Sequence, residues 1–143
     1  MKVKSESAQF FILQFRFKMK KKILIIEDYL NIVEILKMRL EVMGFEVLCA
    51  HDGQAGLNMA RRESPDLIIL DVLLPKMNGY KVSRLLKFDA KFKNIPIIML
   101  TSRETKRHEQ LGLETGADAY VYKSDQKGTL LKLINKFLKS VTN

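Results

Sequence analysis

The sequence contains little cysteine, proline or histidine and no tryptophan: its 143 residues include one cysteine, three prolines and two histidines. A single cysteine, Cys49, excludes an internal disulfide, so we expect a reducing compartment, the cytoplasm. His51 and His108 stand alone, which excludes the ligand spacing of a zinc site. The apolar stretch at residues 10–17 is too short for a transmembrane span and contains Gln14 and Arg16.

The composition that remains is that of one globular domain. Hydrophobic residues make up 47% of the chain, which is enough for a sizeable core. The net charge of +9 is uneven, because residues 1–22 hold seven basic residues and one acidic residue. The rest of the chain is only mildly basic and has no stripe of basic and aromatic residues, so the sequence gives little support for a nucleic-acid surface.

Five short apolar runs alternate with stretches of helical character from Lys22 onward. The runs are Ile23–Ile26, Phe45–Ala50, Leu67–Leu70, Ile95–Leu100 and Ala119–Tyr122. Such continuous apolar runs are typical of strands in a parallel sheet that is covered on both faces. A βα unit repeated five times predicts a doubly wound α/β fold. In this fold ligands bind at the carboxyl ends of the strands.

Helices are predicted over about 29–43, 54–63, 80–90, 105–115 and 127–138. In the first, Tyr29, Val33, Leu36, Leu40 and Met43 share one face, and the third and the last turn Val82, Leu85, Leu86, Leu130, Ile134 and Phe137 inward. The fourth has only Leu111 and Leu113 as large apolar residues and is interrupted by Gly112, so we expect low local stability. It is an exposed helix or an element that moves, and composition favours the first interpretation.

The strand ends supply acidic and basic side chains to a single edge of the sheet. Glu27 and Asp28 end the first run, Asp71 the third, Thr101 the fourth and Lys123 the fifth. Three clustered carboxylates repel one another, and a hard divalent cation such as Mg²⁺ relieves that repulsion. Each residue alone has an ordinary interpretation as a turn former, a helix cap or a solvated charge. Their convergence at one edge favours a functional site.

The chemistry indicated by this set is phosphoryl transfer. The carboxylate of Asp71 can attack a phosphoryl group and form an acyl phosphate. The reaction depends on positioning and charge neutralisation, which Mg²⁺ and Lys123 would supply. The hydroxyl of Thr101 would donate a hydrogen bond to a phosphate oxygen.

The sequence resembles the receiver domain of two-component response regulators over about residues 21–140. The motifs that carry the resemblance are ILIIED at 23–28, DLIILDVLLPKMNG at 66–79, PIIMLTS at 96–102 and GADAYVYK at 116–123. The stretch with Asp71, Pro75 and Gly79 is the most specific of them. The resemblance implies a flavodoxin-like fold with five helices and a five-stranded sheet of order 2-1-3-4-5, and a receiver domain over residues 21–143.

The resemblance also implies a role for each residue of the edge. Asp71 is the expected phosphoacceptor, Glu27 and Asp28 the acidic pair that binds Mg²⁺, and Leu73 the donor of a backbone carbonyl to the ion. Thr101 and Tyr120 are the expected switch residues. Lys123 is expected to be the lysine that the family carries beside the phosphoacceptor.

The expected partners are a sensor histidine kinase or a histidine phosphotransfer protein. A downstream protein would bind the face formed by the fourth helix, fifth strand and fifth helix. We expect no DNA-binding domain within this chain, although one could follow if the chain is part of a longer protein. The sequence is compatible with a dimer.

Two features depart from the family. Ser124 stands where the family usually has a proline joined to the lysine by a cis bond, and a cis bond to a non-proline residue costs about 3 kcal/mol. Residues 1–20 have no counterpart and form a basic, apolar extension. Within it Leu13, Phe15, Phe17 and Met19 alternate with polar residues, which is compatible with an added strand.

Two rival functions remain from the sequence. Phosphatases with an aspartate nucleophile resemble this fold, but they carry a second aspartate two positions on, where this chain has Leu73. A receiver that binds partners without being phosphorylated is the other rival, for which Ser124 leaves room.

Overall fold

The computed structural model describes residues 7–10, 20–102, 106–125 and 128–142. The strands are β1 (Lys22–Ile26), β2 (Glu46–Ala50), β3 (Leu67–Leu70), β4 (Ile97–Thr101) and β5 (Ala119–Tyr122). The helices that alternate with them are α2 (Leu30–Val42), α3 (Gly53–Glu63), α4 (Gly79–Lys87), α5 (Lys106–Glu114) and α6 (Thr129–Thr142). Residues 7–10 form an additional short helical segment.

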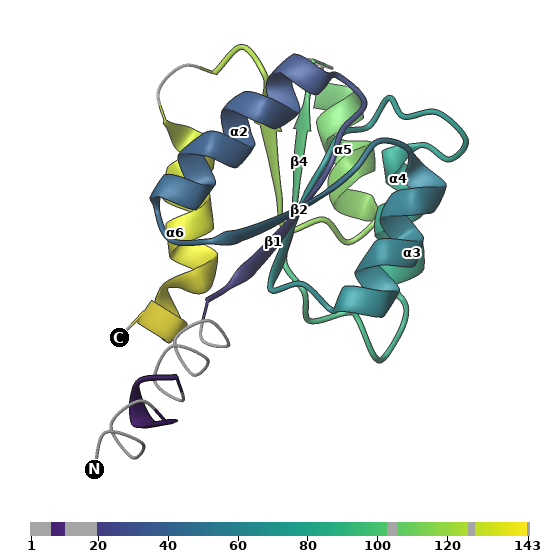
Figure 1. The fold of residues 1–143 in the computed structure, drawn as a ribbon. Helices are drawn as coiled ribbons and strands as arrows, with labels where there is room; N and C mark the ends of the chain where they lie inside the picture. Colours follow the sequence, from purple (N-terminus) through teal and green to yellow (C-terminus); the bar gives the residue numbers. More distant parts are fainter. Residues whose placement is uncertain (1–6, 11–19, 103–105, 126–127, 143) are drawn as a thin grey trace.

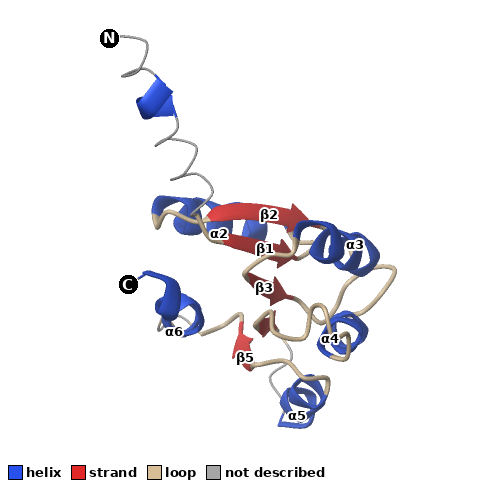
Figure 2. Cartoon of the chain, turned by 90° about the horizontal axis from the view of Figure 1, so that it is seen from below, coloured by secondary structure: helices blue, strands red, loops and turns tan. Residues whose placement is uncertain are grey.

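All five strands are parallel and lie in the order β2-β1-β3-β4-β5. Helices α2 and α6 cover one face of the sheet, and α3, α4 and α5 cover the other (Figures 1 and 2). The predicted doubly wound fold and its strand order are therefore confirmed. The strand order reverses beside β1 and β3, so the crevice at their carboxyl ends is the expected ligand position.

Each inner strand contributes side chains to two separate cores, because successive residues of a strand point to opposite faces. In β1, Leu24 and Ile26 pack with residues of α3 and α4, whereas Ile23 and Ile25 pack with residues of α2 and α6. All four side chains are fully buried. This two-sided burial is the reason why the strands appear in the sequence as continuous apolar runs.

Side-chain caps set the starts of two helices on the same face. The Asp52 side chain accepts a hydrogen bond from the backbone N–H of Ala55 at 2.7 Å and begins α3. The Asn78 side chain accepts one from the N–H of Lys81 at 3.0 Å and begins α4. Such caps satisfy backbone donors that the helix itself leaves without partners.

Some predicted details were wrong at the ends of elements. Strand β4 begins at Ile97 instead of Ile95, because Pro96 has no N–H to contribute to the ladder. Tyr29 precedes the first helical residue and Met43 is the C-cap of α2, so both lie outside the buried stripe and are exposed. Leu85 is exposed as well, since the buried stripe of α4 runs through Val82 and Leu86.

Helix α5 packs on the sheet with little apolar surface, as predicted. Leu111 and Leu113 are exposed, and within the described part of the helix the buried residue is Gly112. A Cβ atom at Gly112 would lie 2.8 Å from Cδ2 of Tyr120 and 2.9 Å from Sδ of Met99. The glycine therefore permits the close approach of α5 to the sheet.

The added strand considered for residues 13–19 lies outside the described residues. No helix in the described ranges combines the length and the apolar character that a membrane crossing requires.

Candidate functional site

The strand register places the predicted site residues side by side. Ile26 pairs with Leu70, and the backbone N–H of Asp71 donates to the carbonyl of Ile26 at 3.0 Å. Glu27 and Asp71, the next residue on each strand, therefore leave the sheet at the same edge. On the other side the backbone N–H of Lys123 donates to the carbonyl of Thr101 at 2.8 Å. The structure thus places the ends of four strands around one crevice.

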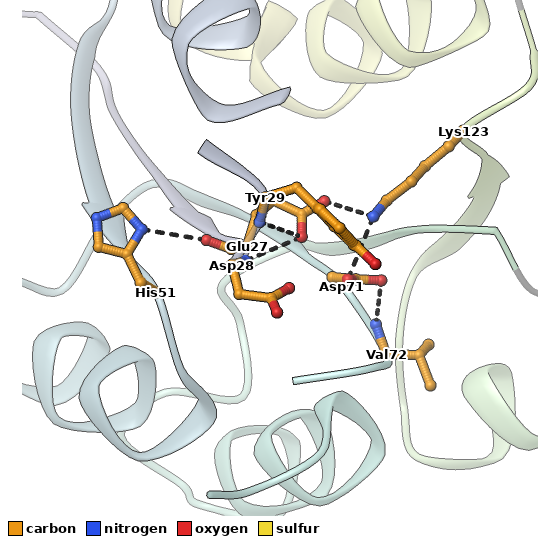
Figure 3. Close-up of polar contacts among 7 residues, drawn as sticks. All are labelled: Glu27, Asp28, Tyr29, His51, Asp71, Val72 and Lys123. Atoms are coloured by element: carbon orange, nitrogen blue, oxygen red, sulfur yellow. Dashed lines mark hydrogen bonds and ion pairs between the residues drawn. The ribbon is translucent and has the colours of Figure 1, made fainter. Parts of the chain in front are cut away.

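The ammonium of Lys123 joins two buried carboxylates in this crevice (Figure 3). Its Nζ atom lies 2.5 Å from Oε1 of Glu27 and 3.2 Å from Oδ2 of Asp71. Glu27 and Asp71 are each only 3% exposed. Because carboxylates at this depth lose most of their hydration, a paired cation is required to keep them charged.

The electrostatics of this group favour binding of a second cation. Burial, aided by the neighbouring charge of Asp71, raises the pKa of Glu27 to about 7 against the opposing effect of Lys123. Burial alone would lower the pKa of Lys123, but Glu27 and Asp71 outweigh burial and raise the pKa. One ammonium therefore does not fully compensate the carboxylates at this edge.

Backbone N–H groups orient the two carboxylates. Oδ1 of Asp71 accepts a hydrogen bond from Val72 at 2.8 Å. Oε2 of Glu27 accepts one from Asp28 at 2.9 Å and one from Tyr29 at 3.3 Å. These bonds hold the carboxylates in place before any ligand arrives, which is the preorganisation that charge-stabilising sites require.

The donor set fits a hard divalent cation. Oxygen atoms of Glu27, Asp28 and Asp71 all lie within 4.8 Å of one another. Oδ1 of Asp28 is buried and has no hydrogen-bond donor among the described residues. A buried oxygen without a donor costs free energy, and an ion coordinated there would remove that cost. Oxygen ligands of this kind suit Mg²⁺, and the three carboxylates are the side chains that would hold it.

The loop that follows Asp71 is folded back onto the site. The N–H of Gly79 donates to the carbonyl of Val72 at 2.8 Å, and a Cβ atom at Gly79 would lie 2.1 Å from the carbonyl oxygen of Asp71. No other residue type fits at this position without displacing the backbone of the acceptor. Leu73 lies in the same loop with its side chain 47% exposed.

The two residues predicted to act as a switch, Thr101 and Tyr120, lie on the neighbouring strands β4 and β5. Thr101 is fully buried at the end of β4. Tyr120 is half-buried on β5, and its ring meets the ring of Tyr122 edge to face with centroids 5.7 Å apart. Burial raises the pKa of Tyr120, so its hydroxyl stays protonated at neutral pH. Their motion on phosphorylation stays a prediction.

Other residues near the site had weaker signals in the sequence. Tyr29 follows the acidic pair directly, and its ring lies over the Lys123 ammonium, 5.0 Å from Nζ to the ring centroid. His51 is exposed, and its Nδ1 lies 3.2 Å from the carbonyl oxygen of Glu27. The peptide bond between Lys123 and Ser124 is trans, so the departure from the family at Ser124 leaves Lys123 in the site.

Comparison with known families and sequences agrees with this geometry. Residues 23–135 match the family described as the response regulator receiver domain. The chain is 41% identical over 124 residues to a probable transcriptional regulator, ycf27, of Cyanophora paradoxa, covering 87% of this chain and 51% of the relative. It is 44% identical over 105 residues to the alkaline phosphatase synthesis transcriptional regulatory protein PhoP of Bacillus subtilis, covering 73% and 43%. The chain spans about half the length of the curated relatives it matches.

Solved structures show the same fold along nearly their whole length. A putative response regulator of Chloroflexus aurantiacus is 30% identical with a TM-score of 0.79, covering 84% of this chain and 98% of that one. The chemotaxis response regulator CheY4 of Vibrio cholerae is 31% identical with a TM-score of 0.77, covering 83% and 99%. The match therefore includes the complete sheet with its helices.

Proposed function

This chain belongs to the response regulator receiver domain family, and from that membership we propose that Asp71 accepts a phosphoryl group in a Mg²⁺-dependent reaction. The family is a signalling domain and not a conventional enzyme. Membership also implies a histidine kinase as partner. The single observation that carries the proposal is the position of Asp71: it is buried, held by backbone and ammonium donors, and close to Asp28, one oxygen of which has no donor in the part of the chain that the structure describes.

The proposed reaction is an in-line transfer from a phosphohistidine. A carboxylate oxygen of Asp71 attacks phosphorus, the phosphorus–nitrogen bond breaks, and the bonding electrons return to the imidazole of the donor. The product is an acyl phosphate, which water later hydrolyses to aspartate and inorganic phosphate. Glu27, Asp28 and Asp71, with the backbone carbonyl of Leu73, would hold Mg²⁺, which supplies charge neutralisation at the phosphate oxygens.

Lys123 has two roles in this proposal. Before transfer it partly compensates the charges of Glu27 and Asp71, and after transfer its ammonium would be within reach of an oxygen of the new phosphoryl group. Thr101 would donate a hydrogen bond to a second phosphate oxygen, and Tyr120 would then move inward. The added charge thereby biases an existing two-state equilibrium of the surface.

The surface that responds is proposed to be the face of α5, β5 and α6. Helix α5 has few large buried side chains, so its position is sensitive to the side chains beneath it. The donor would be a sensor histidine kinase or a phosphotransfer protein in the cytoplasm. A downstream protein would then recognise the shifted face.

Intact mass spectrometry tests the phosphoacceptor role directly. The wild-type chain incubated with acetyl phosphate and Mg²⁺ should gain the mass of one phosphoryl group, and chelation of Mg²⁺ should prevent the gain. Asp71→Asn is the matched control, because it preserves the shape of the side chain and removes the nucleophile. An unmodified wild type, under conditions that label another receiver domain, would favour a receiver that acts without phosphorylation.

A further inference from the structure

Neither the core nor the helix explains the identity of the side chain at position 29. Tyr29 is 62% exposed, so its ring contributes little to the core. It occupies the N-cap of α2, where its side chain makes no capping hydrogen bond. Helices prefer Ser, Thr, Asp or Asn at this position, since their short side chains accept from the first turn. A large aromatic residue here requires another explanation.

The ring of Tyr29 covers the ammonium that the site uses. Nζ of Lys123 lies 5.0 Å from the ring centroid, within the range of a cation–π contact (Figure 3). The same Nζ contacts Oε1 of Glu27 and Oδ2 of Asp71. The ammonium is thus held by two carboxylates and, in addition, by the exposed ring of Tyr29.

A single carboxylate connects both partners of this contact. Oε1 of Glu27 binds the ammonium of Lys123, and Oε2 accepts the backbone N–H of Tyr29 at 3.3 Å. The backbone from which the ring extends is therefore held relative to the ion pair. The arrangement limits the conformations of the lysine side chain, whose four-carbon stem is otherwise flexible.

We propose that Tyr29 is a positioning residue, whose ring holds the Lys123 ammonium in the orientation that meets a phosphoryl group on Asp71. The inference rests on the proposed phosphoacceptor function and adds a residue to it. The contact of the ring is with the Lys123 ammonium, so we assign its effect to Lys123. Its effect depends on the aromatic face and not on the hydroxyl.

Two substitutions separate the ring from the hydroxyl. Tyr29→Leu keeps an apolar side chain but removes the aromatic face, and Tyr29→Phe keeps the face. A cation–π contact at an exposed site contributes about 0.5–1 kcal/mol, so Tyr29→Leu should slow labelling by acetyl phosphate about two- to fivefold. Tyr29→Phe should restore the wild-type rate. Phe88→Leu removes another exposed ring, far along the sequence on the α4 side, and should have no effect.

An NMR measurement tests the contact without phosphorylation. Protons on Cε of Lys123 that lie over an aromatic face are shifted upfield, and this shift should persist in Tyr29→Phe and vanish in Tyr29→Leu. An unchanged shift in Tyr29→Leu, a wild-type labelling rate in that variant, or an equally slow Tyr29→Phe would overturn the proposal. If the wild type is not labelled at all, the phosphoacceptor function fails, and the NMR comparison alone still decides whether the ring holds the ammonium.

Discussion

At the scale of single residues, the site combines burial with a charge that is only partly compensated. Glu27 and Asp71 share the one ammonium of Lys123, while Asp28 supplies an oxygen that has no donor among the described residues. Binding of a cation would recover part of the free energy lost by burying these groups. Substitutions here should therefore change ligand binding in directions that charge alone predicts.

Replacing Lys123 should separate metal binding from phosphorylation. Lys123→Ala removes a positive charge beside the three carboxylates, so Mg²⁺ should bind more tightly, by several-fold in the dissociation constant. Labelling of Asp71 should fall, because the ammonium can no longer meet the phosphoryl group. Fluorescence or NMR titration with Mg²⁺ measures the first effect and intact mass the second. Weaker Mg²⁺ binding in Lys123→Ala would contradict this account.

The side chain of Leu73 should control the lifetime of the phosphorylated state. This large apolar residue lies two positions after Asp71 and is 47% exposed, so it can obstruct the approach of water to the acyl phosphate. Leu73→Asn should accelerate hydrolysis, because the amide leaves more space and can hydrogen-bond the attacking water. The decay of phosphorylated protein after removal of acetyl phosphate measures the rate. An unchanged or slower decay would show that Leu73 does not hinder water.

At the scale of elements, α5 differs from its neighbours in how it attaches to the sheet. Helices α3 and α4 bury leucine and valine side chains and begin with side-chain caps. Helix α5 instead places Gly112 against Tyr120 and Met99. Its position therefore depends on the shape of the sheet surface more than on buried apolar area, which suits a helix that moves with Tyr120.

Filling the space at Gly112 should detach α5 from the sheet. In Gly112→Ala the new methyl group would overlap the Tyr120 ring, and we expect a loss of about 1–2 kcal/mol in the free energy of unfolding despite the better helix propensity of alanine. Hydrogen exchange should accelerate in α5 and stay unchanged in β1 and β3. Leu111→Ala, at an exposed position of the same helix, is the control. A Gly112→Ala protein with wild-type exchange in α5 would disprove the glycine contact.

At the scale of the whole molecule, the sequence pattern predicted the layers better than their edges. The strand Leu67–Leu70 is buried on both faces and has the bounds of its predicted run, whereas the equally buried β4 begins two residues after the start of its run. The expected contact of Lys123 with Asp71 followed from strand order. Details that depend on close approach were not predictable: the sequence pattern makes Gly112 an interruption of its helix and places Tyr29 on a buried stripe. Both depend on which atoms meet across elements that are distant in sequence.

Overall stability should depend on pH through Glu27. Its pKa is about 7 in the folded chain against an ordinary value of 4.5, so between these values the folded state binds more protons than the unfolded state. Protonation of Glu27 contributes fully to the free energy of unfolding below about pH 4.5, and this contribution is lost as the pH rises through 7. The loss is on the order of a few kcal/mol. Urea unfolding in EDTA should show this loss in the wild type but not in Glu27→Gln, whose side chain does not titrate. Saturating Mg²⁺ should cancel the loss, because the ion binds the deprotonated carboxylate. Parallel pH profiles for the two proteins would mean that Glu27 is already ionised well below neutral pH.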